Sequence, residues 1–517
     1  MHHLNRKLIA EKELISREEL EKITAYPEKI LQFGEGKFLL GFMDWMVNSA
    51  NRKGIFQGRV VIAPPRRDHL LDVINGQDGF FTMFSRGKKG GSNIEKREII
   101  ASVSRAVSPR LQWKELERCI EQPLLKIVVS NTTEAGIIYR REAPLCSRRP
   151  PETYPAKLAA LLFHRYTHFN GEPGSGMLVL PLELIEDNGR ILREILEHHA
   201  RDWNMPDGFF RWLEQENLFL NTLVDRIVTG LSDKEKEKLW NELGYRDELI
   251  NAGEVFCQFF IEAEPDTGSL FPLHKAGLTV KWVKDLKPYR TRKVRILNGA
   301  HTATVALALL RGLPTVRDAV NDSVIKVFME SFLYDEAIPA TVGSGEAGEE
   351  ELLSFAKDVL ERFDNPFIEH YWQDISTNSV SKFRTRILPS FFDYLKLNGD
   401  LPRCICLSLA ALIALYRGSE PNGGEMQLSF KNTFSLKEEP EILSKFYAHW
   451  QEAEKRGACT DQYDALENLT ANILRDNSMW GADLTEVSGL APKVTMFLQK
   501  IIGEGITDAL LKKGDTN

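Results

Sequence analysis

Short hydrophobic runs, many of them β-branched, alternate with amphipathic stretches through the first half of the chain. The runs have the length of buried strands and the stretches have helical periodicity. The expected strands are residues 30–33, 59–63, 125–130, 177–182 and 255–262. The expected helices are residues 38–48, 155–169 and 190–203. This alternation predicts an α/β fold in which helices cover a largely parallel sheet.

The pattern changes near residue 284, beyond which helical periodicity dominates. A chain of 517 residues is too long for one hydrophobic core. We therefore expect two domains, residues 1–284 and residues 285–517. The longest apolar stretch, residues 404–416, is shorter than the ~20 residues that span a bilayer, so we expect a buried helix there.

Composition and charge narrow the function. Hydrophobic residues make up 43% and charged residues 27%, the balance of an ordered globular protein. A net charge of -7 disfavours nucleic acid and anionic membranes as partners and favours a small molecule. Charges run through the first 20 residues without an apolar core of a secretory signal, so we expect a cytoplasmic protein. We expect its six scattered cysteines to be reduced thiols.

Residues 30–46 are expected to form a strand, a glycine turn and a helix. Such a turn lets the backbone approach a pyrophosphate at the helix N-terminus. Gly34 and Gly36 fit the first two glycine positions of a dinucleotide site, but Leu39 stands where the third is expected. The turn alone therefore does not establish such a site.

A complete G-x-G-x-x-G occurs at residues 343–348, but three glutamates follow it directly. Their carboxylates would repel a phosphate, and no strand–helix–strand unit surrounds the segment. We interpret it as a solvated loop and helix start.

Ser130 ends the strand expected at residues 125–130, and Asn131 and Thr132 follow it directly. Strand ends at one edge of a parallel sheet are where a cofactor would lie, although these residues can equally cap the next helix. An NAD site ideally has an acidic residue after the second strand to bind the ribose diol, and Asp68 comes late for that position. Arg66 and Arg67 could instead bind the 2′-phosphate of NADP. These residues leave NAD and NADP both open.

Lys293, Asn298 and His301 are the strongest candidates for chemistry. In an α-helix, Asn298 lies about 140° and His301 about 80° round from Lys293, so all three share one broad face. A lysine can serve as a proton donor in carbonyl reduction when burial or cationic neighbours lower its pKa. The alternative is an ordinary basic helix end beside a core histidine. For His164 and His168 we expect a structural role, because Arg165 replaces the glutamate of a zinc motif.

Four segments together resemble the long-chain mannitol dehydrogenase family. They are FGEGKF at 33–38, VDRI at 224–227, KVRILNGAH at 293–301 and RFDNP at 362–366. The resemblance implies a Rossmann-type N-terminal domain, a mostly α-helical C-terminal domain, an active site in the cleft between them, NAD as cofactor and no metal. It implies that Lys293, Asn298 and His301 are catalytic. The cofactor-binding residues that it indicates are Gln32, Phe33, Gly34, Glu35, Gly36, Lys37, Phe38, Ser130, Asn131 and Thr132.

Other segments, such as SNTTEAGI at 130–137, resemble the members of this family that reduce a hexuronate, a keto sugar acid. Leu184 replaces an asparagine of the polyol-oxidising members and Asp374 replaces an arginine, which disfavours a plain hexitol. Lys382, Arg384 and Arg386 place three cations within five residues. The guanidinium groups suit a substrate carboxylate, and the alternative is that these residues form a solvated basic face. The substrate-binding residues expected are Asp225, Lys382, Arg384 and Arg386. The competing hypotheses are another uronate or polyol dehydrogenase and a catalytically silent nucleotide-binding regulator.

Overall fold

The computed structural model describes residues 1–64, 68–132, 134–143, 150–428, 434–457 and 462–511. The chain forms two compact units. Unit 1 comprises residues 1–87 and 94–286, and unit 2 comprises residues 88–93 and 287–517. Arg66, Arg67, Cys146 and Cys459 lie outside the described residues.

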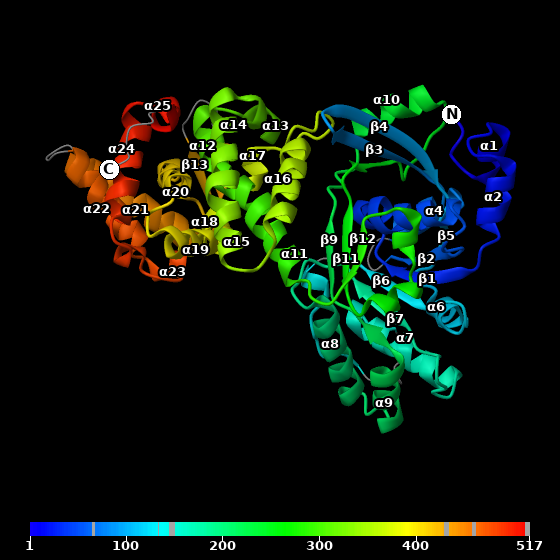
Figure 1. The fold of residues 1–517 in the computed structure, drawn as a ribbon. Coiled ribbons are helices and arrows are strands. Elements are labelled where there is room, and N and C mark those ends of the chain that lie inside the picture. The colour runs from blue at the N-terminus through cyan, green and yellow to red at the C-terminus, as the bar shows by residue number, and fades with distance from the viewer. Residues whose placement is uncertain (65–67, 133, 144–149, 429–433, 458–461, 512–517) are drawn as a thin grey trace. The chain divides into compact units, whose positions relative to one another are not determined.

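A parallel sheet forms the centre of unit 1, as predicted (Figure 1). It has six strands, of which β5 and β8 were not expected. Its order is β5-β2-β1-β6-β7-β8. The strands are β1 Glu28–Phe33, β2 Arg59–Ala63, β5 Val103–Ala106, β6 Ile127–Ser130, β7 Leu178–Pro181 and β8 Leu218–Phe219. The chain order reverses between β1 and β6, and in open parallel sheets ligands bind outside the carboxyl ends of the strands at that point.

Hydrophobic cores cover both faces of this sheet. Ile30 of β1 packs into one core with Phe42 and Met46, whereas Leu31 packs into the other with Leu158. This explains why the strands are continuous hydrophobic runs. The helices of unit 1 are α1 Arg6–Glu11, α2 Arg17–Thr24, α3 Lys37–Leu39, α4 Trp45–Arg52, α5 Asp68–Gly76, α6 Trp113–Ile120, α7 Tyr154–His168, α8 Asn188–Asp202, α9 Asp207–Glu216 and α10 Asp233–Leu243. Its π-helix is η1 Leu40–Asp44, and its 3-10 turns are η2 Glu134–Gly136, η3 Pro265–Ser269 and η4 Leu273–Ala276.

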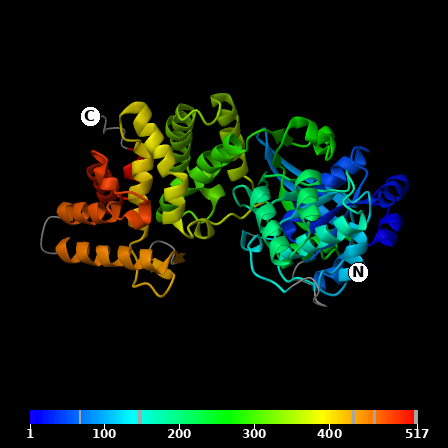
Figure 2. The same cartoon turned by 90° about the horizontal axis from the view of Figure 1, so that it is seen from below.

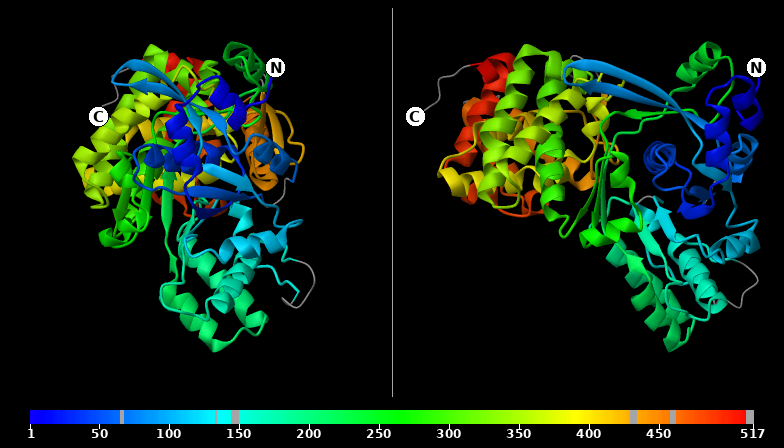
Figure 3. Two further views of the ribbon diagram at one scale, coloured as in Figure 1. Left: turned by 90° about the vertical axis from the view of Figure 1, so that its right-hand side faces the viewer. Right: turned by 45° about the vertical axis from the view of Figure 1, so that its right-hand side comes forward.

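Two smaller sheets in unit 1 were not expected. One has the order β10-β3-β4 and contains a long hairpin, visible in Figure 3. Its strands are β3 Phe81–Lys89, β4 Ser92–Ile100 and β10 Asn251–Glu254. The other, β12-β11-β9, comprises β9 Thr222–Asp225, β11 Gln258–Glu262 and β12 Val280–Val283. The single strand predicted at 255–262 was therefore wrong in extent: only β11 lies in it, and β11 pairs antiparallel to β9.

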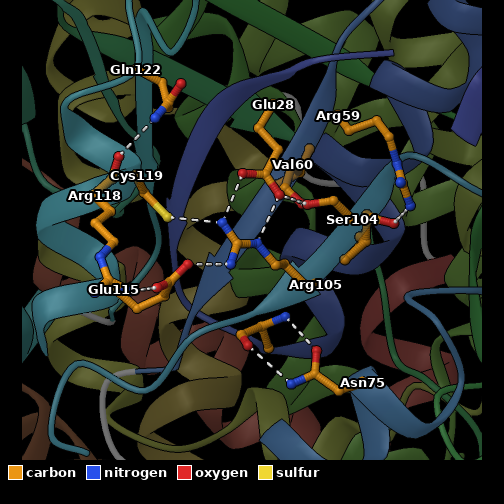
Figure 4. Close-up of polar contacts among 12 residues, drawn as sticks. Glu28, Arg59, Val60, Asn75, Ser104, Arg105, Glu115, Arg118, Cys119 and Gln122 are labelled. Carbon is orange, nitrogen blue, oxygen red and sulfur yellow. Dashed lines mark hydrogen bonds and ion pairs between the residues drawn. The ribbon is translucent and has the colours of Figure 1, made fainter. Parts of the chain in front are cut away.

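Side chains hold the edge strand β5 in place (Figure 4). Arg105 donates to both carboxylate oxygens of Glu28, at 2.9 and 3.1 Å, and to Glu115 of α6 at 2.6 Å. The amide of Asn75 in α5 bonds both the N–H and the C=O of Ala106, at 2.8 and 3.0 Å. Asn75 thus satisfies backbone groups that an open sheet edge would expose.

Unit 2 is mostly helical, as predicted (Figure 2). The predicted buried helix is α20, whose residues from Cys404 to Leu415 are all buried. The α-helices are α11 Lys287–Arg292, α12 Gly299–Arg311, α13 Val316–Asn321, α14 Ser323–Ser331, α15 Ile338–Gly343, α16 Glu349–Phe363, α17 Trp372–Ile375, α18 Ser379–Arg386, α19 Leu388–Asn398, α20 Arg403–Leu415, α21 Pro440–Gly457, α22 Gln462–Leu474, α23 Asn477–Trp480, α24 Leu490–Gly503 and α25 Ile506–Leu511. The other elements are the π-helices η5 Lys293–Asn298 and η6 Phe332–Ala337, the 3-10 turn η7 Leu484–Glu486, and the strands β13 Glu425–Leu428 and β14 Phe434–Lys437.

Cys119, Cys404 and Cys406 are buried thiols, as expected. Burial raises the pKa of Cys406 to about 12, which keeps this thiol protonated and unreactive. In the described part of the chain, no helix combines the length and apolarity required to span a membrane.

Candidate active site

The glycine turn joins β1 to α3 at the switch point of the sheet. Gly34 has φ +132°, and a Cβ atom there would lie 2.7 Å from Leu39 Cδ1 and 3.1 Å from the Asn131 carbonyl oxygen. Position 34 therefore accepts only glycine without strain. Gly36 is the N-cap of α3, so the backbone presents its unpaired N–H groups and positive dipole end directly after the turn.

A third glycine does exist, two residues later than expected. A Cβ atom on Gly41 would lie 2.8 Å from Val228 Cγ1 and 3.2 Å from Met83 Cε, so this glycine permits close packing of the helix. Leu39 instead lies buried against Gly34. Position 39 holds leucine, as the sequence indicated, so the three glycines have the spacing G-x-G-x4-G.

The side chains around the turn divide into two groups. Gln32 and Phe33 are fully buried, so they lie beneath the turn and away from solvent. Gly36 and Lys37 are exposed, while Glu35 and Phe38 are half-buried. A ligand on the turn would therefore meet residues 35–38 and the backbone rather than the side chains of the strand.

Ser130, Asn131 and Thr132 lie beside the turn. Ser130 is in register with Phe33, and the Asn131 N–H donates to the Phe33 carbonyl at 3.1 Å. The Ser130 hydroxyl donates to Glu183 at 3.0 Å, and the Thr132 N–H and hydroxyl donate to it at 2.8 and 3.0 Å. The buried Glu183 at the end of β7 thus anchors this loop, a role that the sequence pattern did not indicate.

Replacing each of the two turn glycines by alanine shows which of them the backbone conformation of the turn requires. We expect Gly34→Ala to lower the melting temperature and to weaken NADH binding, because both φ and the close contacts are violated. Gly36→Ala should leave the melting temperature within about 2 °C, because φ is -67° and no described atom lies within 4 Å of the added methyl. Thermal unfolding and NADH fluorescence titration measure the two effects. A Gly34→Ala protein with unchanged melting temperature and unchanged NADH affinity would contradict the requirement for glycine at position 34.

In unit 2, Lys293 begins the π-helix η5 and Asn298 ends it. The regular α-helix assumed from the sequence was therefore wrong over these residues. A π-turn forms hydrogen bonds from residue i to i+5, so it brings residues five apart closer to one face than an α-helix does. Lys293 and Asn298 are separated by five positions. Single π-turns in helices frequently occur at functional sites.

The arginines next to Lys293 are paired with acids. Arg292 bonds Glu351 at 2.5 Å and stacks over the Phe355 ring at 4.3 Å. Arg295 bonds Asp393 and also Glu346, the latter at 3.1 Å. These arginines are buried, which argues against an ordinary solvated basic helix end.

The glycine-rich segment at 343–348 supplies part of that pairing. As expected, it is a helix end and loop that leads into α16, whose N-cap is Gly348. Its Glu346 accepts from Arg295 and, at 3.3 Å, from Lys287. The single carboxylate of this segment therefore pairs with a lysine of α11 and an arginine of η5.

His301 occupies a buried aromatic pocket in unit 2. Its ring stacks on Phe363 at 4.2 Å between centroids and meets His370 at 5.1 Å and Trp372 at 6.0 Å. Among the described residues, its buried Nε2 has no hydrogen-bond partner. Burial, and then the positive field of His370 and of nearby arginines, holds the pKa of His301 well below its ordinary value. The imidazole is therefore neutral near pH 7 and can bond a substrate hydroxyl.

Two of the three cations predicted on α18 lie near His301. Arg386 donates to the Thr302 hydroxyl at 3.4 Å, and Lys382 donates to the Ile375 carbonyl at 2.9 Å. Burial lowers the pKa of both side chains, and both lower the pKa of His301. Arg384 is exposed on the same helix and donates to the Ser478 carbonyl at 3.4 Å.

His370 was missed by sequence reasoning. It follows α16 by seven residues and belongs to no helix or strand, yet its ring lies against His301. Burial lowers the pKa of His370, whereas Asp374 opposes the shift.

The other positions singled out from the sequence are Asp225, Leu184 and His164, and each has its own surroundings. Asp225 is buried at the end of β9, where it pairs with Gln258 of β11. Leu184, in place of the polyol asparagine, is 63% exposed. His164 bonds the Glu121 carboxylate at 2.8 Å on the surface of α7. No group of three His, Cys, Asp or Glu side chains within the described ranges is arranged to hold a metal ion.

The chain is similar to known proteins over nearly its whole length. Residues 28–273 match the mannitol dehydrogenase Rossmann domain and residues 285–502 the mannitol dehydrogenase C-terminal domain. It is 38% identical to the altronate oxidoreductase of Halalkalibacterium halodurans, covering 95% of this chain and 94% of that one. It is 39% identical to the altronate oxidoreductase of Bacillus subtilis, covering 94% and 95%.

Solved structures show the same fold. D-sorbitol dehydrogenase matches with a TM-score of 0.75 and 19% identity, over 94% of this chain and 96% of that one. Pseudomonas fluorescens mannitol 2-dehydrogenase, in a ternary complex with NAD and D-mannitol, matches with a TM-score of 0.66 and 19% identity, over 95% and 96%. The chain therefore belongs to the mannitol dehydrogenase family and is an oxidoreductase with a Rossmann-type N-terminal domain.

Proposed function

We propose that this protein interconverts tagaturonate and altronate with NADH and NAD. The observation that carries the proposal is that two cations, Lys382 and Arg386, lie near the buried His301. The chain is also related to altronate oxidoreductases. A partly buried ammonium and guanidinium strongly favour a substrate carboxylate. Tagaturonate and altronate carry that carboxylate, whereas hexitols do not.

The residues around the glycine turn fit a dinucleotide. Gly34 and Gly36 allow a pyrophosphate to approach the N-terminus of α3, and Asn131 lies at the adjacent strand end. Bound NADH would supply the hydride that reduces the ketone carbon. The preference for NAD over NADP rests on the family resemblance. A cytoplasmic location follows from the proposal, because the reaction draws on NADH.

Lys293 is the proton donor of the proposed reduction. Its ammonium donates a proton to the ketone oxygen as negative charge develops there, and in the oxidative direction its amine removes that proton from the alcohol. Asn298 donates a hydrogen bond to the same oxygen. The neutral His301 uses its buried Nε2 to fix a substrate hydroxyl. Asp225 is assigned to the substrate through the family resemblance.

The substrate is identified by following NADH absorbance with tagaturonate, fructuronate and fructose. We expect kcat/KM for tagaturonate to exceed that for fructose by about 100-fold, because a site built for a carboxylate leaves its cations unpaired with a neutral sugar. A preference for fructose would indicate a polyol dehydrogenase. Binding of NADH without turnover of any of the three would indicate a regulator.

A further inference from the structure

A buried amide and a buried carboxyl group lie side by side beneath the glycine turn. Gln32 comes from β1 and Asp44 from η1, and both side chains are fully buried. Gln32 Nε2 donates to the Gly34 carbonyl at 3.2 Å and to Asp44 Oδ2 at 3.1 Å. Both N–H bonds of this amide are therefore used, one of them on the turn itself.

The two remaining oxygens of the pair lack donors. Within the part of the chain that the structure describes, neither Gln32 Oε1 nor Asp44 Oδ1 has a hydrogen-bond partner, and both are buried. The amide cannot be reversed, because the Gly34 carbonyl requires a donor. A proton on Asp44 Oδ1 directed at Gln32 Oε1 would satisfy both oxygens and close a ring of two hydrogen bonds.

The surroundings favour that proton. Burial raises the pKa of Asp44 to about 7, and the hydrogen bond from Gln32 opposes this only in part. The neighbouring charges are engaged elsewhere: Arg226 donates to the Gly41 carbonyl and lies over the Trp45 ring, and Glu98 accepts from the Trp45 indole. Ser102 donates to the backbone carbonyl of Asp44 and leaves the carboxyl group unaffected.

We propose that Asp44 is a neutral carboxylic acid that donates its proton to Gln32, and that this acid–amide pair positions the Gly34 carbonyl and the dinucleotide-binding turn. The inference rests on the proposed cofactor site. Ionisation would set a carboxylate oxygen against the Gln32 carbonyl oxygen, so the pair would separate and release Gly34. NADH affinity should therefore fall as the pH rises through about 7, where Asp44 loses its proton.

Asp44→Asn tests the pair without removing it. The asparagine Nδ2 can donate to Gln32 Oε1 while its Oδ1 accepts from Gln32 Nε2, and it does not ionise. At pH 6 we expect the NADH Kd of the variant to lie within about twofold of the wild-type value. By pH 8.5 the wild-type Kd should have risen relative to the variant Kd by at least about threefold. Parallel Kd curves across this range would overturn the positioning role.

Two further measurements keep the inference independent of turnover. The infrared difference spectrum between wild type and Asp44→Asn at pH 6 should contain the carbonyl stretch of a protonated carboxylic acid, and its absence would overturn the neutral state of Asp44. Gln32→Leu should weaken NADH binding about tenfold, since the Gly34 carbonyl loses its donor. None of these readouts uses a uronate, so failure of the proposed substrate would leave them interpretable. If wild type fails to bind NADH, the cofactor proposal and the positioning role fall together, while the infrared band still decides the protonation.

Discussion

Replacing Lys293 by alanine should lower kcat for tagaturonate reduction by about 10²- to 10⁴-fold, the usual contribution of a positioned proton donor. The NADH Kd should stay near its wild-type value, because the glycine turn belongs to unit 1 and Lys293 to unit 2. Steady-state kinetics and NADH fluorescence titration measure these quantities separately. A small primary amine added to the variant should restore part of the rate, which a loss of folding would not allow.

Lys287→Ala is the matched control for this variant. Lys287 lies on the preceding helix α11, and its 67% exposed side chain pairs with Glu346. Exposed ion pairs contribute about 1 kcal/mol or less, so we expect kcat within about twofold of wild type. Near-normal turnover in the Lys293 variant, or equal losses in both variants, would contradict the proposed proton transfer.

Removing the guanidinium of Arg386 should have the second largest effect. Arg386→Leu should lower kcat/KM for tagaturonate by roughly 30-fold or more, the loss expected when a partly buried charge no longer meets its partner. Lys382→Met should act in the same direction. Activity on fructose, where detectable, should change far less, because that substrate has no carboxylate.

Arg384→Leu is the control on the same helix. Its exposed side chain reaches the Ser478 carbonyl, away from the contact that Arg386 makes with Thr302. We expect kcat/KM for tagaturonate within about twofold of wild type. The account fails if Arg384→Leu is as damaging as Arg386→Leu, or if Arg386→Leu lowers activity on both substrates equally.

Hydrophobic periodicity predicted β1, β2, β6 and β7 of the central sheet and α20, because strands buried on both faces and a fully buried helix leave continuous apolar runs. It missed the short strands β5 and β8, which are only partly buried. It failed for the β3–β4 hairpin. Most of β4 is exposed, so its sequence SNIEKREII has polar residues where a buried strand would be apolar. Burial produces the signal, and the largely exposed strand β4 produces little of it, whereas the first five residues of β3 are buried.

The candidate site shows a similar division. Local spacing pointed to Gly34 and Gly36, because the glycine turn lies within one turn of chain. Lys293 was singled out by spacing together with the family resemblance, and the roles of all three residues stay predictions. The π-turn of η5 was not predictable from side-chain pattern, because it is a change of backbone hydrogen-bond register. Glu183 and His370 were missed for another reason: each meets its partner across about 50 residues or more of sequence, and only folding brings them together.

The most direct test of the account compares tagaturonate with tagatose, the matched ketose that has a hydroxymethyl group in place of the carboxylate. The measurement is kcat/KM for each with NADH, on the same enzyme and at the same pH. The account predicts a preference for tagaturonate of about 100-fold or more, because Lys382 and Arg386 are left unpaired by the neutral sugar. Equal kcat/KM values, or a preference for tagatose, would contradict a site built around a sugar acid.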